Sequence, residues 1–263
     1  MSLSLSDLLI LVVEPSSMQQ KALSSLLRAR GVEHIVTAKT GNEAFALLQS
    51  QTPDLVVSAY YLDDMTGSDL VRGMRREEAL ARVPFMLVSS ETRFEPLDPI
   101  RQAGVVALID KRAAEDGLDE ALAATLEYLQ PTPIDLGTID CEDVVIGLAD
   151  DSRMARRHMV STLNALGFER IHCVEDGLEA QRLIAEQNLD ILITDLHMPG
   201  MDGEALCRWV RSDSAQNSIP ILAVTSDTNQ DRLDLVLQAG ANHVCIKPFD
   251  INHLRILLPD LLK

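Results

Sequence analysis

Short runs of apolar residues alternate with longer amphipathic segments along the whole chain. The runs are too short for helices and are typical of strands covered on both faces. In the longer segments apolar residues recur every three or four positions, as at Ala155, Met159 and Leu163, which is typical of one helix face. The strand candidates are residues 8–13, 34–38, 55–58, 85–88 and 106–109, then 144–149, 170–174, 191–194, 221–224 and 243–246.

This pattern occurs twice at one constant spacing. Glu14 aligns with Asp150, and the alignment continues through both copies without an insertion or a deletion. Turn glycines and strand-end residues repeating at one spacing indicate a duplicated domain. The same spacing joins Gly31 to Gly167, Gly41 to Gly177, Asp54 to Asp190, Gly67 to Gly203, Pro84 to Pro220, Gly104 to Gly240 and Lys111 to Lys247.

Strands that alternate with helices predict a parallel sheet with helices on both faces, joined by right-handed crossovers. We therefore predict an α/β fold with two doubly wound, five-stranded parallel-sheet domains in tandem, each a (βα)5 unit. The domains are expected at residues 5–129 and 142–263, with a linker at 130–141 where Pro131 and Pro133 end the preceding helix. In such sheets the functional loops lie at the carboxyl ends of the strands.

The composition is typical of globular domains, and the net charge argues against some classes of partner. The chain has 263 residues, 46% of them apolar, and a net charge of −17, which argues against direct binding to nucleic acid or to an anionic membrane. No apolar run is long enough to cross a membrane, and the N-terminus lacks the basic start of a signal peptide. Cys141, Cys173, Cys207 and Cys245 lack metal-type spacing and are predicted to be reduced, buried thiols of a cytoplasmic protein.

Polar residues follow several predicted strands of the second copy. Asp150 and Asp151 follow its first strand, Asp195 its third, Thr225 its fourth and Lys247 its fifth. Three carboxylates at one sheet edge repel one another unless a cation compensates them, and Mg²⁺ prefers such oxygen ligands. Lysine and threonine would contact a tetrahedral anion, so the predicted chemistry is attack by one carboxylate on a phosphoryl group. Taken singly, each residue also has a structural explanation, such as a helix cap for Asp151.

The combined pattern resembles the receiver domain of bacterial two-component response regulators, of the chemotaxis type. The resemblance covers nearly all of residues 142–263 and implies a flavodoxin-like fold for each copy. It rests on Asp150-Asp151, Asp195 with the following Met198-Pro199-Gly200-Met201-Asp202-Gly203, Thr225, and Lys247-Pro248-Phe249.

The resemblance implies a role for each residue. Asp195 is the expected phosphoacceptor. Mg²⁺ would be bound directly by Asp151, Asp195 and the backbone carbonyl of His197, with Asp150 acting through water. The partner that donates the phosphoryl group would be a histidine kinase or a phosphotransfer protein, and a homodimer or a downstream protein target is a further expectation.

The resemblance also implies which residues contact the phosphoryl group and pass the signal on. Lys247 and Thr225 would contact the phosphoryl group, and the Lys247–Pro248 bond is commonly cis in this family. Receivers usually carry an aromatic residue three positions before the lysine, but this sequence has Val244 there. Coupling of phosphorylation to the signalling surface is therefore expected to differ. His197 and Asp227 stand at variable positions that tune phosphate lifetime in the family.

The first copy is predicted to be a degenerate pseudo-receiver. An alanine replaces the acceptor and a proline replaces a metal ligand, so residues 5–129 lack the chemistry. Ser58, Asp63 and Asp64 are unconvincing substitutes from their places relative to the strand end. We expect Lys111 to pair with Glu14 and the domain to serve docking, dimerisation or regulation. The constant spacing maps Asp195 to Ala59, Asp151 to Pro15, Asp150 to Glu14, Thr225 to Ser89, Lys247 to Lys111 and Pro248 to Arg112.

Three functions compete, and a fourth is disfavoured. The leading one is a phosphorylation-dependent signalling switch that is not an enzyme beyond its own phosphorylation and dephosphorylation. The alternatives are a phosphorylation-independent interaction scaffold, or the regulatory part of a longer chain whose output domain is an enzyme such as a diguanylate cyclase. A magnesium-dependent phosphatase is disfavoured, since such enzymes carry a second aspartate two residues past the nucleophile and this chain has His197 there.

Overall fold

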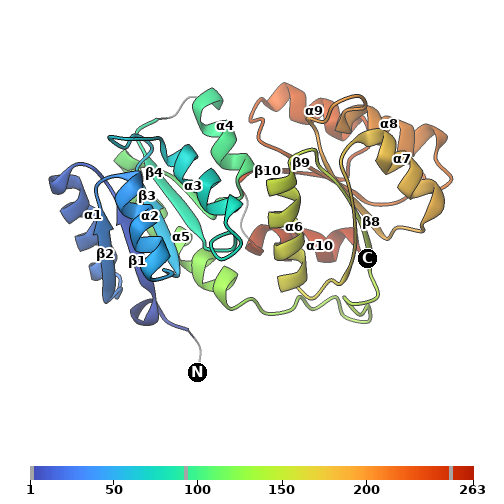
Figure 1. Ribbon diagram of the computed structural model, residues 1–263. Coiled ribbons are helices and arrows are strands. Elements are labelled where there is room, and N and C mark those ends of the chain that lie inside the picture. The colour runs from blue at the N-terminus through green and yellow to red at the C-terminus, as the bar shows by residue number, and fades with distance from the viewer. Residues whose placement is uncertain (1–2, 92–93, 249–250) are drawn as a thin grey trace. The chain divides into compact units, whose positions relative to one another are not determined.

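The computed structural model describes residues 3–91, 94–248 and 251–263. It divides into two compact units, Met1–Pro131 and Thr132–Lys263, each built around its own sheet (Figure 1). The division falls within the stretch 130–141 that the sequence suggests as a linker. Phe249, which belongs to the motif of the resemblance, lies outside the described residues.

The first unit is a parallel sheet of β1 to β5 in the spatial order β2-β1-β3-β4-β5. Two short 3-10 segments, Leu5–Asp7 and Lys111–Ala113, precede β1 and follow β5. The elements in chain order are β1 (Leu9–Val13), α1 (Ser17–Ala29), β2 (His34–Ala38), α2 (Gly41–Ser50), β3 (Leu55–Ser58), α3 (Gly67–Arg76), β4 (Phe85–Ser89), α4 (Phe94–Gln102), β5 (Ala107–Asp110) and α5 (Ala114–Leu129).

The second unit repeats this topology, with its sheet in the order β10-β9-β8-β6-β7 and every pair of strands parallel. The predicted fold class is therefore confirmed for both copies. The elements are β6 (Val145–Ala149), α6 (Arg153–Ala165), β7 (Arg170–Val174), α7 (Gly177–Glu186), β8 (Ile191–Asp195), α8 (Gly203–Asp213), β9 (Ile221–Thr225), α9 (Gln230–Gln238), β10 (His243–Ile246) and α10 (Ile251–Leu261).

Alternate residues of each central strand serve two separate core layers. In β6, Ile146 and Leu148 pack with α6 and α10 on one face of the sheet. Val145 and Ala149 point the other way, into a layer with α7, α8 and α9. Both faces are thus buried, which is why the strands appear in the sequence as continuous apolar runs rather than as an alternating pattern.

The four cysteines are thiols outside any disulfide, but they are not all buried. The prediction of buried thiols is correct for Cys141, Cys207 and Cys245 and wrong for Cys173. Cys173 lies on β7, an edge strand of the second sheet, where residues are less covered than on the central strands. Among the described residues, no helix has the length and apolarity needed to cross a membrane.

The stretch between the two sheets packs mainly on the second unit. The Ile134 amide donates to the Leu166 carbonyl at 2.9 Å, and the Cys141 thiol donates to the Ile134 carbonyl at 3.3 Å. Arg255 of α10 donates to the Thr132 carbonyl at 2.8 Å. From Thr132 onward, these residues are therefore held by hydrogen bonds to the second domain.

One arginine in each domain binds the backbone of two loops at the amino-terminal edge of the sheet. Arg211 of α8 donates to the carbonyls of Asn217, Ile219 and Gly240 at 2.8, 2.9 and 3.0 Å. Arg75 of α3, the equivalent residue of the first copy, donates to the carbonyls of Val83, Ala103 and Gly104 at 2.9, 3.0 and 3.2 Å. Burial lowers the pKa of both guanidinium groups. These contacts fix the loops that enter β4 and β5, and likewise β9 and β10.

Replacement of Arg211 by methionine should lower the free energy of unfolding of the second domain by about 2–4 kcal/mol, because several carbonyls lose a charged donor. Arg208→Met is the matched control, since Arg208 is exposed and pairs on the surface with Glu204, and it should cost less than about 0.5 kcal/mol. Trp209 is the only tryptophan and reports this domain in chemical denaturation. Equal midpoints for the two variants would contradict the structural role.

Candidate functional site

The last residue of β8 is Asp195, and the chain must turn sharply after it. The α8 helix begins at Gly203, whose amide donates to the Leu196 carbonyl at 3.0 Å. A Cβ atom on Gly203 would come within 2.2 Å of the Asp195 carbonyl oxygen, so this position requires glycine. Asp202 caps the helix by accepting from the Ala205 amide at 2.8 Å. The loop motif therefore brings the start of α8 against the backbone of Asp195.

Three carboxylates meet at the carboxyl end of the sheet. Asp150 and Asp151 follow β6, which pairs directly with β8, and oxygen atoms of Asp150, Asp151 and Asp195 all lie within 4.8 Å of one another. Asp150 and Asp195 are only 5% and 2% exposed, whereas Asp151 is exposed. Elsewhere in the described residues no other three His, Cys, Asp or Glu side chains come as close. The cluster thus has two buried members and one that faces solvent.

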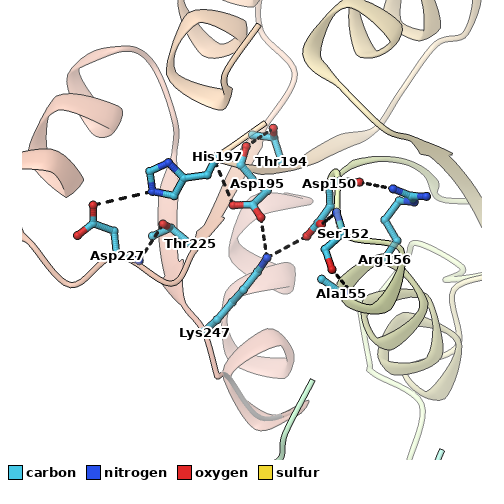
Figure 2. A network of polar contacts seen from close by, with 10 residues as sticks. All are labelled: Asp150, Ser152, Ala155, Arg156, Thr194, Asp195, His197, Thr225, Asp227 and Lys247. Atoms are coloured by element: carbon cyan, nitrogen blue, oxygen red, sulfur yellow. Dashed lines mark hydrogen bonds and ion pairs between the residues drawn. The ribbon is translucent and has the colours of Figure 1, made fainter. Parts of the chain in front are cut away.

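The ammonium group of Lys247 lies between the two buried carboxylates. Its Nζ is 2.9 Å from Oδ2 of Asp150 and 2.8 Å from Oδ2 of Asp195 (Figure 2). Burial disfavours the charged ammonium, but the two carboxylates outweigh burial and raise the pKa of Lys247. Burial also raises the pKa of Asp150, against the opposing effect of Lys247. The Lys247–Pro248 bond is cis, as the resemblance implies.

The charge balance of this cluster suits a divalent cation. Three carboxylates and one ammonium leave the site with a net negative charge, and the exposed Asp151 gives it an open side. Hard oxygen ligands of this kind suit Mg²⁺, which keeps part of its water shell. Asp150, Asp151 and Asp195 are therefore the side chains that could hold the ion.

The remaining predicted residues lie beside this cluster. The hydroxyl of Thr225, at the end of β9, is buried and accepts from the Asp227 amide at 3.0 Å. The His197 amide donates to Oδ1 of Asp195 at 3.3 Å. The imidazole of His197 turns toward Asp227, with Nε2 3.9 Å from Oδ2, and not toward the carboxylates (Figure 2). For His197, the backbone rather than the side chain therefore faces Asp195.

In the first domain the equivalent position has a different set of contacts. Lys111 binds Glu14 with Nζ 2.7 Å from Oε2, which confirms the predicted pair, and it also binds Gln19. Ala59 occupies the position of Asp195 and is buried. The lysine is thus neutralised by the one carboxylate that remains.

Two of the three possible substitutes for an acceptor in the first domain, Ser58 and Asp64, are engaged in other contacts. The Ser58 hydroxyl donates to the Ala59 carbonyl at 2.8 Å. Asp64 accepts from the amides of Gly41 and Asn42, at 2.8 Å each, where α2 begins. Both side chains therefore have a structural role.

Arg156 is a neighbour of the site that no motif in the sequence marks. This α6 residue donates to the Asp150 carbonyl at 2.5 Å and pairs with Glu175 at 2.5 Å. The equivalent residue of the first domain is Gln20, which also donates to the Glu14 carbonyl, at 3.2 Å. The two copies carry different residues at this position, and a contact to a backbone carbonyl leaves no pattern in a single sequence. The sequence therefore does not mark Arg156 as a site residue.

The chain is similar in sequence to chemotaxis proteins. The chain is 40% identical to chemotaxis protein CheY1 of Helicobacter pylori over 103 residues, 39% of this chain and 83% of that protein. It is 37% identical to chemotaxis protein CheY of Pseudomonas aeruginosa over 102 residues, 39% of this chain and 82% of that protein.

Two solved structures are among those to which the chain is similar. The receiver domain of a sensor histidine kinase from Pseudomonas aeruginosa, with a magnesium ion in its active-site cleft, is 29% identical over 45% of this chain and 97% of that chain, with a TM-score of 0.43. A probable two-component system response regulator/GGDEF domain protein is 18% identical over 97% of this chain and 98% of that chain, with a TM-score of 0.44.

The family model described as the response regulator receiver domain matches residues 10–123 and again residues 146–258. These two matches coincide with the two parallel sheets and together cover most of the sequence. The chain therefore belongs to the response regulator receiver family of two-component systems and carries two receiver domains in tandem.

Proposed function

We propose that the second receiver is a phosphorylation switch whose acceptor is Asp195, and that the first receiver is a regulatory or docking domain without this chemistry. The observation that carries the proposal is the cluster of three carboxylates within 4.8 Å, two of them bridged by Lys247. A histidine kinase or phosphotransfer protein would be the partner. Four cysteines outside any disulfide fit a reducing compartment, so we propose the cytoplasm as the place of the exchange.

In the proposed reaction a carboxylate oxygen of Asp195 attacks the phosphorus of a phosphohistidine. The new P–O bond forms as the P–N bond breaks, and the electron pair of that bond stays on the histidine nitrogen, which takes up a proton. Mg²⁺, held by Asp150, Asp151 and Asp195 with the His197 carbonyl, would supply positive charge for the phosphoryl oxygens. Buried Lys247, already aimed at Asp195, would exchange a carboxylate contact for one to the phosphoryl group.

Thr225 would supply the second contact to the phosphoryl group. Its hydroxyl accepts from the Asp227 amide, which leaves the hydroxyl proton available for donation to an anion. The new contacts of Thr225 and Lys247 exist only in the phosphorylated state. They therefore favour a different arrangement of the loops after β9 and β10, which is how the charge becomes a signal.

The scaffold alternative has weaker support for the second domain. A pure docking surface has no need of two buried carboxylates and a buried lysine, since such groups are costly to desolvate. The first domain bears less of this cost, because Ala59 replaces one of the two buried carboxylates and Lys111 is more exposed than Lys247. Phosphorylation-independent binding therefore suits the first domain.

Asp195→Asn should take up no phosphoryl group from a small acyl phosphate with Mg²⁺, since an amide is not a nucleophile toward phosphorus. Intact-mass spectrometry of the full chain should show one added phosphoryl group for wild type and none for the variant. Asp202→Asn, which preserves a capping side chain outside the cluster, should keep the uptake. Uptake by the Asp195 variant at a residue of the first domain would refute the assignment of both domains.

Lys247→Met should destabilise the second domain by about 3–5 kcal/mol without metal, because two buried carboxylates lose their counter-charge. Added Mg²⁺ should recover part of this loss and should bind the variant more tightly than wild type. Denaturation followed at Trp209 with and without Mg²⁺ measures both effects. Lys263→Met, which removes an exposed pair with Asp260, is the control and should respond to Mg²⁺ as wild type does.

A further inference from the structure

The Arg156 side chain links the backbone of the carboxylate cluster to the residue that follows the neighbouring strand β7. Its guanidinium donates through Nη1 to the Asp150 carbonyl at 2.5 Å (Figure 2). Through Nη2 it donates to Glu175, which follows β7, also at 2.5 Å. The Arg156 side chain is 12% exposed, whereas that of Glu175 is 70% exposed. The arginine thus reaches inward from α6 to a carbonyl, with its charge balanced at the surface.

The first domain supplies an internal comparison at the same position. Gln20 is the counterpart of Arg156 there, and its Nε2 donates to the Glu14 and Ala38 carbonyls at 3.2 and 2.9 Å. Glu175 is replaced by Lys39, which could not pair with an arginine. Both domains therefore hold the same carbonyl from the same helix position. Only the domain with three carboxylates combines this contact with an ion pair.

The Asp150 carbonyl lies at the start of the turn that presents two of the three carboxylates. The Asp150 amide donates to the Val174 carbonyl at 3.3 Å, and one Asp150 oxygen accepts from the Ser152 amide at 2.8 Å. A charged donor on the carbonyl therefore adds a short contact where the Asp150–Asp151 backbone bends. An unbalanced guanidinium so near would also repel a cation, and Glu175 offsets that repulsion.

We propose that Arg156 is a positioning residue for the divalent cation, and that Glu175 is its charge partner. Arg156 fixes the Asp150–Asp151 backbone so that both carboxylates converge with Asp195. This role rests on the proposed function, since it concerns the same cation site. Loss of a residue that orients the ligands of a metal typically lowers metal affinity by about 10–100-fold.

The test compares double variants of the full chain that keep the net charge of wild type. Arg156→Met combined with Glu175→Gln removes the carbonyl contact and leaves the local charge balance unchanged. Its dissociation constant for Mg²⁺, measured by calorimetry without any phosphodonor, should rise about tenfold or more. Arg156→Gln with Glu175→Gln installs the side chain that Gln20 provides in the first domain, and it should recover most of the lost affinity. As a control, Arg157→Met, an exposed change on the same helix, should bind as wild type does.

Each outcome decides one claim. Wild-type affinity in the methionine double variant overturns the role of Arg156, as does equal loss in the glutamine and methionine double variants. Absence of Mg²⁺ binding by the wild-type chain overturns the proposed cation site itself. Should the methionine variant fail to fold, as judged by Trp209 fluorescence, the glutamine variant decides alone. It must then bind Mg²⁺ nearly as wild type does, and a tenfold loss overturns the proposal.

Discussion

The chemistry of the second domain depends on one buried electrostatic arrangement, an ammonium group shared by two carboxylates that come from different strands. Lys247 follows β10 at one edge of the sheet, Asp150 follows β6, and Asp195 ends the strand between β6 and β9. None of the three charges would be stable alone in a site that is 5% exposed or less. The ammonium group gives both carboxylates a counter-charge, and the strand order keeps the three groups within reach of one another.

Much of this arrangement could be predicted from the sequence, for a physical reason. Parallel strands covered on both faces give continuous apolar runs, and the turns between them need glycine and proline, so strand ends are visible as positions where a run stops. The constant spacing between the two copies fixes which strand ends correspond. The predicted limits of the strands at 34–38, 55–58, 170–174 and 243–246 coincide with β2, β3, β7 and β10.

Other features have no such signal. Arg156, Arg75 and Arg211 all donate to backbone carbonyls, which every residue possesses, so no particular partner type marks them in the sequence. The exposure of Cys173 depends on the strand order, since an apolar segment looks alike whether its strand is central or at the edge. The turn of the His197 imidazole toward Asp227 likewise depends on loop geometry that spacing alone does not fix.

The Glu14–Lys111 pair of the first domain has a consequence for how readily that domain could regain its chemistry. A change of Ala59 to aspartate would add a buried carboxylate to a domain whose Lys111 already binds Glu14 and Gln19, and Pro15 would still stand in place of a second ligand for a cation. The aspartate at position 59 would be buried, with neither a counter-charge nor a metal ion to offset its desolvation. A single substitution that restores one residue of the site is therefore unfavourable on its own. The Glu14–Lys111 ion pair thus disfavours recovery of the acceptor.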